Sequence, residues 1–69
     1  MKRQWKRGER VYRYDSAKAN SIIFSAPNFY MWAWGVWASK ETHEGIEHGL
    51  NAAKVKANAV LDRIESEAA

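Results

Sequence analysis

Cations and aromatic rings alternate near the start of the chain, a combination that could bind an anionic polymer. Lysine and arginine neutralise phosphates and aromatic rings stack on bases, so interleaved residues of both kinds indicate nucleic-acid contact. The predicted nucleic-acid-binding residues are Lys6, Arg7, Arg10, Tyr12, Arg13 and Tyr14. The same pattern has a purely structural explanation, because an edge strand uses charge against aggregation while its tyrosines pack in the core.

The net charge of +3 is spread unevenly along the chain. Residues 1–18 hold seven basic and two acidic side chains, whereas residues 40–69 hold four basic and six acidic ones. A basic end of this kind indicates an anionic partner, although a solvated basic tail gives the same pattern.

A second group of side chains lies in the aromatic segment 29–37. Alternation along a strand sends Tyr30, Trp32, Trp34 and Val36 to one face, and Phe29, Met31, Ala33, Gly35 and Trp37 to the other. Both faces are apolar, so the strand should be central, and a single helix would leave one face uncovered for interaction. The predicted protein-interface residues are Trp5, Tyr30, Trp32, Trp34 and Trp37.

The segment His43-Glu44-Gly45-Ile46-Glu47-His48 comes close to the metal-binding pattern His-Glu-x-x-His. The segment does not match this motif, because the fifth position is Glu47 and a glycine interrupts the helix that the motif needs. As a strand it sends His43 and Glu47 to one face and Glu44 and His48 to the other. We therefore expect no metal and no cofactor.

Catalytic signatures are missing from the sequence. It has no cysteine, no Gly-x-Ser-x-Gly elbow and no phosphate-binding glycine loop. A fold of 69 residues should also leave little volume for a pocket of the usual 300 Å³ or so. We expect a non-catalytic protein.

The first half of the chain is predicted to form strands. Glu9–Asp15 and Ser21–Ser25 are rich in residues that favour a pleated sheet, and Ala26-Pro27-Asn28 is a turn signal before the aromatic strand. In the first strand, Arg7, Val11 and Arg13 would share one face, with Arg10, Tyr12 and Tyr14 on the other.

In the second half of the chain, the spacing of the apolar residues changes. Apolar residues recur at helical spacing and predict a helix over about 50–67. Residues 42–49 have two interpretations, a helix that begins at Thr42 or a strand over His43–His48 after a turn at Lys40-Glu41. We favour the strand, because the interior glycines Gly45 and Gly49 would each cost a helix about 1 kcal/mol.

These elements predict one α+β domain over residues 1–69, in which an antiparallel sheet of three or four strands carries one C-terminal helix on a face. Residues 1–8 form a basic start that should be frayed, 9–48 the sheet and 50–67 the helix. No secretory signal is visible and the apolar run Phe29–Ala38 is too short to span a bilayer. We expect a soluble, cytoplasmic protein.

The segment 30–64 resembles a loose pattern in small phage and prophage accessory proteins, a Trp-x-Trp-x-Val strand followed by a glycine and an alanine-rich helix. The matching residues are Trp32, Trp34, Val36, Gly45, Ala53 and Ala57. The resemblance implies a viral accessory protein but no chemistry. The order of elements is also similar to DNA-binding modules with a three-stranded sheet and a helix, such as the arm-binding domains of phage integrases and the plant AP2 domain.

The sequence thus predicts a binding module that engages a nucleic acid or nucleoprotein target through its basic-aromatic strand. Two alternatives stay open. The chain could inhibit a host protein, for example in a defence or transcription complex, or form a homodimer through its aromatic face.

Overall fold

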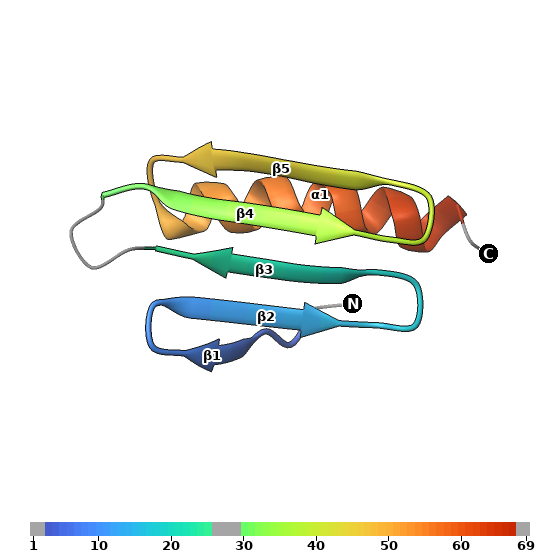
Figure 1. Cartoon of the computed structure of the whole chain (residues 1–69), viewed down its shortest axis with the longest axis horizontal. Coiled ribbons are helices and arrows are strands. Elements are labelled where there is room, and N and C mark those ends of the chain that lie inside the picture. Colours follow the sequence, from blue (N-terminus) through green and yellow to red (C-terminus); the bar gives the residue numbers. More distant parts are fainter. Residues whose placement is uncertain (1–2, 26–29, 68–69) are drawn as a thin grey trace.

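The structure is a five-stranded antiparallel sheet with one helix packed on it. It is a computed structural model that describes residues 3–25 and 30–67, so the turn predicted at Ala26-Pro27-Asn28 lies outside the described residues. The strands follow one another across the sheet in chain order, each paired with the next (Figure 1). The elements are β1 (Lys6–Gly8), β2 (Val11–Asp15), β3 (Asn20–Phe24), β4 (Trp32–Trp37), β5 (Thr42–Glu47) and α1 (Leu50–Glu67). The α+β class is confirmed, while the prediction of three or four strands was too low.

The missing strand is β1, which pairs antiparallel with β2. The segment predicted as one strand from Glu9 begins instead with a turn at Glu9 and Arg10, and the sheet starts at Lys6. Arg10 has a positive φ of 54°, which lets the chain reverse between Gly8 and Val11. Sequence reasoning missed β1 because Lys6 and Arg7 lack strand preference, and only backbone pairing with β2 makes them extended.

The strand interpretation of residues 42–49 is confirmed. Gly45 lies in β5 directly opposite Trp34 of β4. Gly49 then opens the helix, because its carbonyl accepts the first helical hydrogen bond, from the Ala53 amide at 3.1 Å. Helix α1 covers the range that the apolar periodicity predicts.

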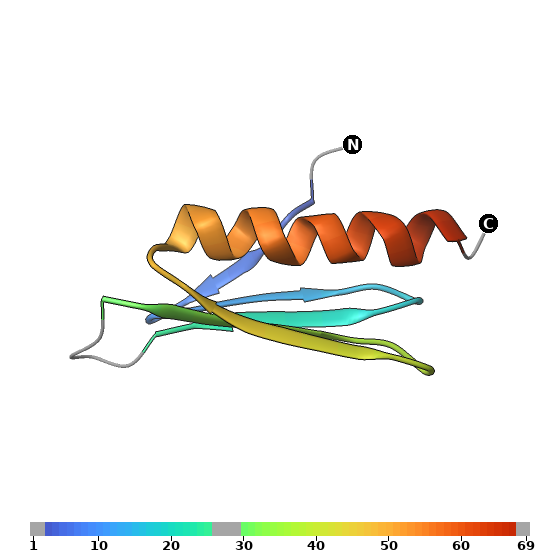
Figure 2. The ribbon, with the colours of Figure 1, turned by 90° about the horizontal axis from the view of Figure 1, so that it is seen from above.

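A small core lies between α1 and one face of the sheet, with the helix stacked on that side alone (Figure 2). The helix packs mainly on β4 and also on β5 and β3. Alanine at two of the contact positions brings the helix backbone close to the sheet, which leaves room for the large Trp34 ring. The buried apolar residues are Ala19, Ile23, Trp34, Val36, Ala53, Ala57, Leu61 and Ile64.

The buried serines Ser21 and Ser25 are hydrogen-bonded. The Ser21 hydroxyl donates to the Gly35 carbonyl at 2.8 Å, which ties β3 to β4 through a side chain as well as the backbone.

Within the described ranges, no helix has the length and apolar character needed to cross a bilayer.

The two glycines of β4 and β5 offer a matched test of this packing. A methyl group at Gly45 would lie 2.8 to 3.0 Å from the buried Trp34 indole, whereas one at Gly35 would meet its nearest atoms at 3.9 Å. We expect Gly45→Ala to lower the free energy of unfolding by about 1 to 3 kcal/mol, because the indole has no space to move. Gly35→Ala should leave it unchanged or raise it by up to about 1 kcal/mol, because alanine restricts the unfolded chain. Urea unfolding in dilute solution measures both, and equal effects would contradict this account of the core.

Candidate functional site

The strand register divides the sheet side chains between two faces, because directly paired residues point the same way. The covered face lies under α1 and includes Tyr12, Ile23 and Trp34, which are aligned across three strands. The open face is the opposite side. It carries Lys6, Val11, Arg13, Asp15, Asn20, Ile22, Phe24, Ala33, Gly35, Trp37, Thr42, Glu44 and Ile46.

The six predicted nucleic-acid-binding residues do not form one surface. Lys6 and Arg13 pair directly and lie on the open face, whereas Arg7 pairs with Tyr12 on the other side. The predicted grouping of Arg7 with Val11 and Arg13 was therefore wrong. The reason is the unforeseen turn at Arg10, which places Arg7 and Arg13 on different strands.

Both tyrosines are engaged inside the molecule. Tyr12 is half-buried, with the Lys54 ammonium 4.5 Å from its ring centroid and the Trp32 ring centroid at 6.1 Å. Tyr14 is also half-buried, packs against Trp5 at 5.6 Å between centroids, and donates its hydroxyl to Glu65 at 2.7 Å. These rings contribute to the covered face rather than to a stacking surface.

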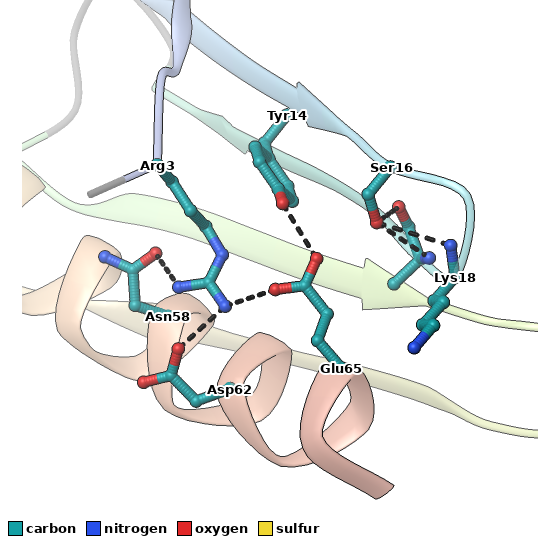
Figure 3. Close-up of polar contacts among 8 residues, drawn as sticks. Arg3, Tyr14, Ser16, Lys18, Asn58, Asp62 and Glu65 are labelled. Atoms are coloured by element: carbon teal, nitrogen blue, oxygen red, sulfur yellow. Dashed lines mark hydrogen bonds and ion pairs between the residues drawn. The ribbon is translucent and has the colours of Figure 1, made fainter. Parts of the chain in front are cut away.

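Figure 3 shows a polar cluster that joins the start of the chain to α1. The Arg3 guanidinium lies 2.6 Å from the Glu65 carboxylate and 2.7 Å from that of Asp62, and it donates to Asn58 at 3.3 Å. It also lies 5.4 Å from the Tyr14 ring centroid. The Arg3 side chain is only 12% exposed, so this residue of the basic start is docked on the helix, and the expectation of a frayed segment was wrong at Arg3.

Sequence reasoning did not identify the Arg3 cluster. The available signal is weak: Asn58, Asp62 and Glu65 recur at helical spacing on one side of α1. Nothing in the order of residues shows that position 3 reaches them, because the contact spans 62 residues of the chain.

The cluster also determines the protonation of its members. Burial alone would raise the pKa of the Glu65 carboxyl, but hydrogen bonds from Tyr14 and Arg3 outweigh it and lower the pKa below its ordinary value. Burial and the neighbouring Glu65 raise the pKa of Tyr14. The phenol therefore stays a hydrogen-bond donor to an ionised carboxylate.

Four cations of the β1–β2 hairpin stay outside such networks. We call Lys6, Arg7, Arg10 and Arg13 the hairpin cations. All four are exposed, and none makes an ion pair with a residue in the described part of the chain. Arg63 is a contrast, since it pairs with Glu41 and, at 2.8 Å, with Glu67.

The five predicted interface aromatics are distributed over both faces. Trp34 is buried, and Trp5 and Trp32 are half-buried against the core. The Trp34 indole donates to Glu47 at 3.2 Å. Trp37 lies on the open face and is 41% exposed, and Tyr30 precedes β4 and is almost fully exposed. Phe24, which sequence reasoning did not select, joins Trp37 on the open face with 48% exposure.

Two open hollows mark the surface. One of about 530 Å³ runs over β4 on the open face, where Ala33 and Gly35 lie between the larger Phe24, Trp37 and Ile46. The other, of about 810 Å³, lies where the β2–β3 and β4–β5 turns approach the end of α1. The expectation that so small a fold leaves little volume for a pocket was wrong, because one hollow lies on the open face and the other lies between the turns and the end of α1, neither of them inside the core.

The histidine segment does not gather metal ligands. His43 Nε2 lies 2.7 Å from Glu41 and 3.2 Å from Arg63, in a surface network that ties β5 to α1. Within residues 3–25 and 30–67, no group of three or more histidine, cysteine or acidic side chains could hold a metal ion.

Comparison with protein-family models, with curated proteins and with solved structures found no match. The resemblance to small phage accessory proteins therefore stays a prediction.

The Glu65 cluster makes acid stability testable. The pKa of Glu65 is lower in the folded than in the unfolded chain, so its contribution is complete above the ordinary value of 4.5 and is lost as the pH falls through the folded-state value. We expect Glu65→Gln to lower the free energy of unfolding by about 1 to 2 kcal/mol near neutral pH, with a smaller difference from the parent protein in acid.

Urea unfolding at about pH 7 and about pH 3 measures the difference. Glu67→Gln is the matched control, because this carboxylate lies on the exposed side of the same helix end, where it pairs with Arg63. A deficit for Glu65→Gln that is equal at both pH values would show that the carboxylate is not stabilised by these contacts.

Proposed function

We propose that this chain is a non-catalytic binding module that holds a nucleic acid or nucleoprotein through the hairpin cations. The observation that carries the proposal is the concentration on one small hairpin of exposed positive charge that has no ion-pair partner among residues 3–25 and 30–67. Lysine and arginine in such an arrangement contact phosphates and release counterions on binding.

The pairing of Lys6 with Arg13 supports a role in binding. These two cations lie directly opposite each other on neighbouring strands, where like charges destabilise a sheet. Edge protection against aggregation needs charge on β1 but not a second cation opposite it on β2. An anionic partner would relieve this repulsion.

Charge rather than ring stacking should dominate the contact. Tyr12 and Tyr14 are engaged by Lys54 and Glu65 on the covered face, so they do not offer free ring faces for bases. Contacts to phosphate fix position but carry no sequence information. We therefore propose binding that is steeply dependent on salt and largely independent of sequence.

The biological setting is proposed on the resemblance alone. The Trp32, Trp34 and Val36 pattern, with its alanine-rich helix, supports a phage-type accessory protein that acts in the host cytoplasm. Inhibition of a host protein is the second candidate, and the apolar Phe24 and Trp37 on the open face favour it over base stacking. Capture of a host protein that survives nuclease treatment would support this candidate over the first.

The hairpin cations can be tested without disturbing the fold. Arg7→Ala removes an exposed charge, and Arg10→Gly removes another while placing glycine at the positive φ of 54°, a conformation that glycine adopts without strain. We expect each change to weaken binding to labelled DNA or RNA, and to reduce the slope of log affinity against log salt by about 0.7 to 0.9. Fluorescence anisotropy between about 50 and 200 mM salt measures the slope.

Lys56→Ala is the matched control, because Lys56 is an exposed cation on α1 rather than on the hairpin. If the parent protein does not bind nucleic acid, or binds it with an affinity that does not depend on salt, the proposal is wrong. If Lys56→Ala lowers the affinity for nucleic acid by the same factor, the contact does not lie on the hairpin.

A further inference from the structure

We propose that the open face binds a second copy of this chain, face to face, with a two-fold axis that runs along β3. The product would be a two-sheet sandwich with the two helices on its outer surfaces. This inference does not rest on nucleic-acid binding, although the open face includes two of the hairpin cations, Lys6 and Arg13.

The open face has an apolar centre that nothing in the described chain covers. Phe24 and Trp37 are 48% and 41% exposed there, and Ile46 is 62% exposed. The helix packs on the other side only (Figure 2), while antiparallel sheets with one solvated face normally present polar residues on it. An apolar sheet face of this kind is typical of an interface.

Charges on the open face select the orientation of the second copy. Lys6, Arg13, Ile22, Gly35 and Glu44 form one row across all five strands. The row is basic at the β1–β2 edge and acidic at the β5 edge. A partner surface must carry the same row in reverse to match it.

A two-fold axis along the strands supplies that reversed row. It places β5 of one copy over β1 of the other, so Glu44 meets Lys6 of the second copy and Lys6 meets its Glu44. A two-fold axis across the strands would instead stack each cation on its own equivalent. Like charges at an interface cost several kcal/mol, so the first arrangement is strongly preferred.

Side-chain sizes are complementary at three facing positions in the same arrangement, whereas Ile22 and Phe24 meet their own equivalents on the axis and Trp37 lies over Asp15. With the axis on β3, Ile46 lies over Gly8 of the second copy, Val11 over Ala33, and Arg13 over Gly35. Each of these three contacts joins a large residue to a small one, which is how facing sheets interdigitate. The hollow over Ala33 and Gly35 would be filled by side chains of the second copy.

The extent of the face is near the lower limit for a specific interface. Five strands about 4.8 Å apart make a surface roughly 24 Å wide, and two such surfaces would bury on the order of 1,000 Å² in total. We expect a dimer that dissociates on dilution, with a dissociation constant in about the micromolar range.

The dimer would divide the hairpin cations between two tasks. Lys6 would face Glu44 of the second copy and Arg13 would lie over its Gly35, next to that Glu44, while Arg7 and Arg10 would stay free at both edges of the sandwich. Self-association and nucleic-acid binding can therefore be disturbed separately.

Sedimentation equilibrium over a range of protein concentrations tests the proposal. We expect Glu44→Lys and Lys6→Glu each to raise the dissociation constant by roughly tenfold to a hundredfold, because each change acts twice in a symmetric dimer. The protein that carries both changes should return to within about threefold of the parent. The rescue must act between copies, because β1 and β5 of one sheet lie roughly 19 Å apart.

Two further variants complete the design. Lys56→Glu reverses an exposed charge on α1 and should leave the dissociation constant unchanged. Phe24→Asp should abolish the dimer, because it places two carboxylates together at the axis, and its exposed position should leave the fold of the monomer intact, as checked by circular dichroism.

A parent protein that is monomeric at every concentration would overturn the proposal. So would a dimer in which Glu44→Lys has no more effect than Lys56→Glu, or in which the double change restores nothing. If Arg10→Gly loses nucleic-acid binding but still dimerises, this inference stands. If the parent protein binds nucleic acid but does not dimerise, only the proposed function stands.

Discussion

The packing of one alanine-lined helix against one face of a tryptophan-bearing sheet is the constraint on which this structure depends. Ala53 and Ala57 are fully buried and let the helix approach Trp34 and the strands around it. Because residues 3–25 and 30–67 contain a single helix, this packing covers one side of the sheet and leaves the other open. Both proposed interaction surfaces follow from that asymmetry.

Within the described part of the chain, the same asymmetry separates cations that form ion pairs from those that do not. Arg3 reaches over the covered face to the acidic side of α1, and Arg63 ties the helix to the β4–β5 turn through Glu41. The cations of the β1–β2 hairpin lie at the far edge of the sheet, beyond the strands on which α1 packs. Their charge is available to another molecule because the helix and its carboxylates do not reach them.

The two proposals describe different uses of one edge and one face. Electrostatic attraction at the hairpin acts over a distance and weakens with salt, whereas burial of Phe24 and Trp37 needs contact and is much less sensitive to salt. A small core supplies limited stability by itself, so a second copy on the open face would also stabilise the fold. The two effects would reinforce each other, since a dimer presents two hairpins to a long anionic polymer.

The sequence by itself determined the class of the fold, the helix over 50–67, a strand at residues 43–48 that the structure places at 42–47, and the alternation of β4. These are local properties: apolar residues recur at 3.6 or 2 positions, and Gly45 and Gly49 disfavour a helix. Only the tertiary structure decided that Lys6 and Arg7 form a strand, that Tyr12 and Tyr14 face α1, and that Arg3 docks on Glu65. Each of these features depends on a contact between segments that are far apart in the sequence. Local residue patterns do not show which distant segments come together, because only folding brings them into contact.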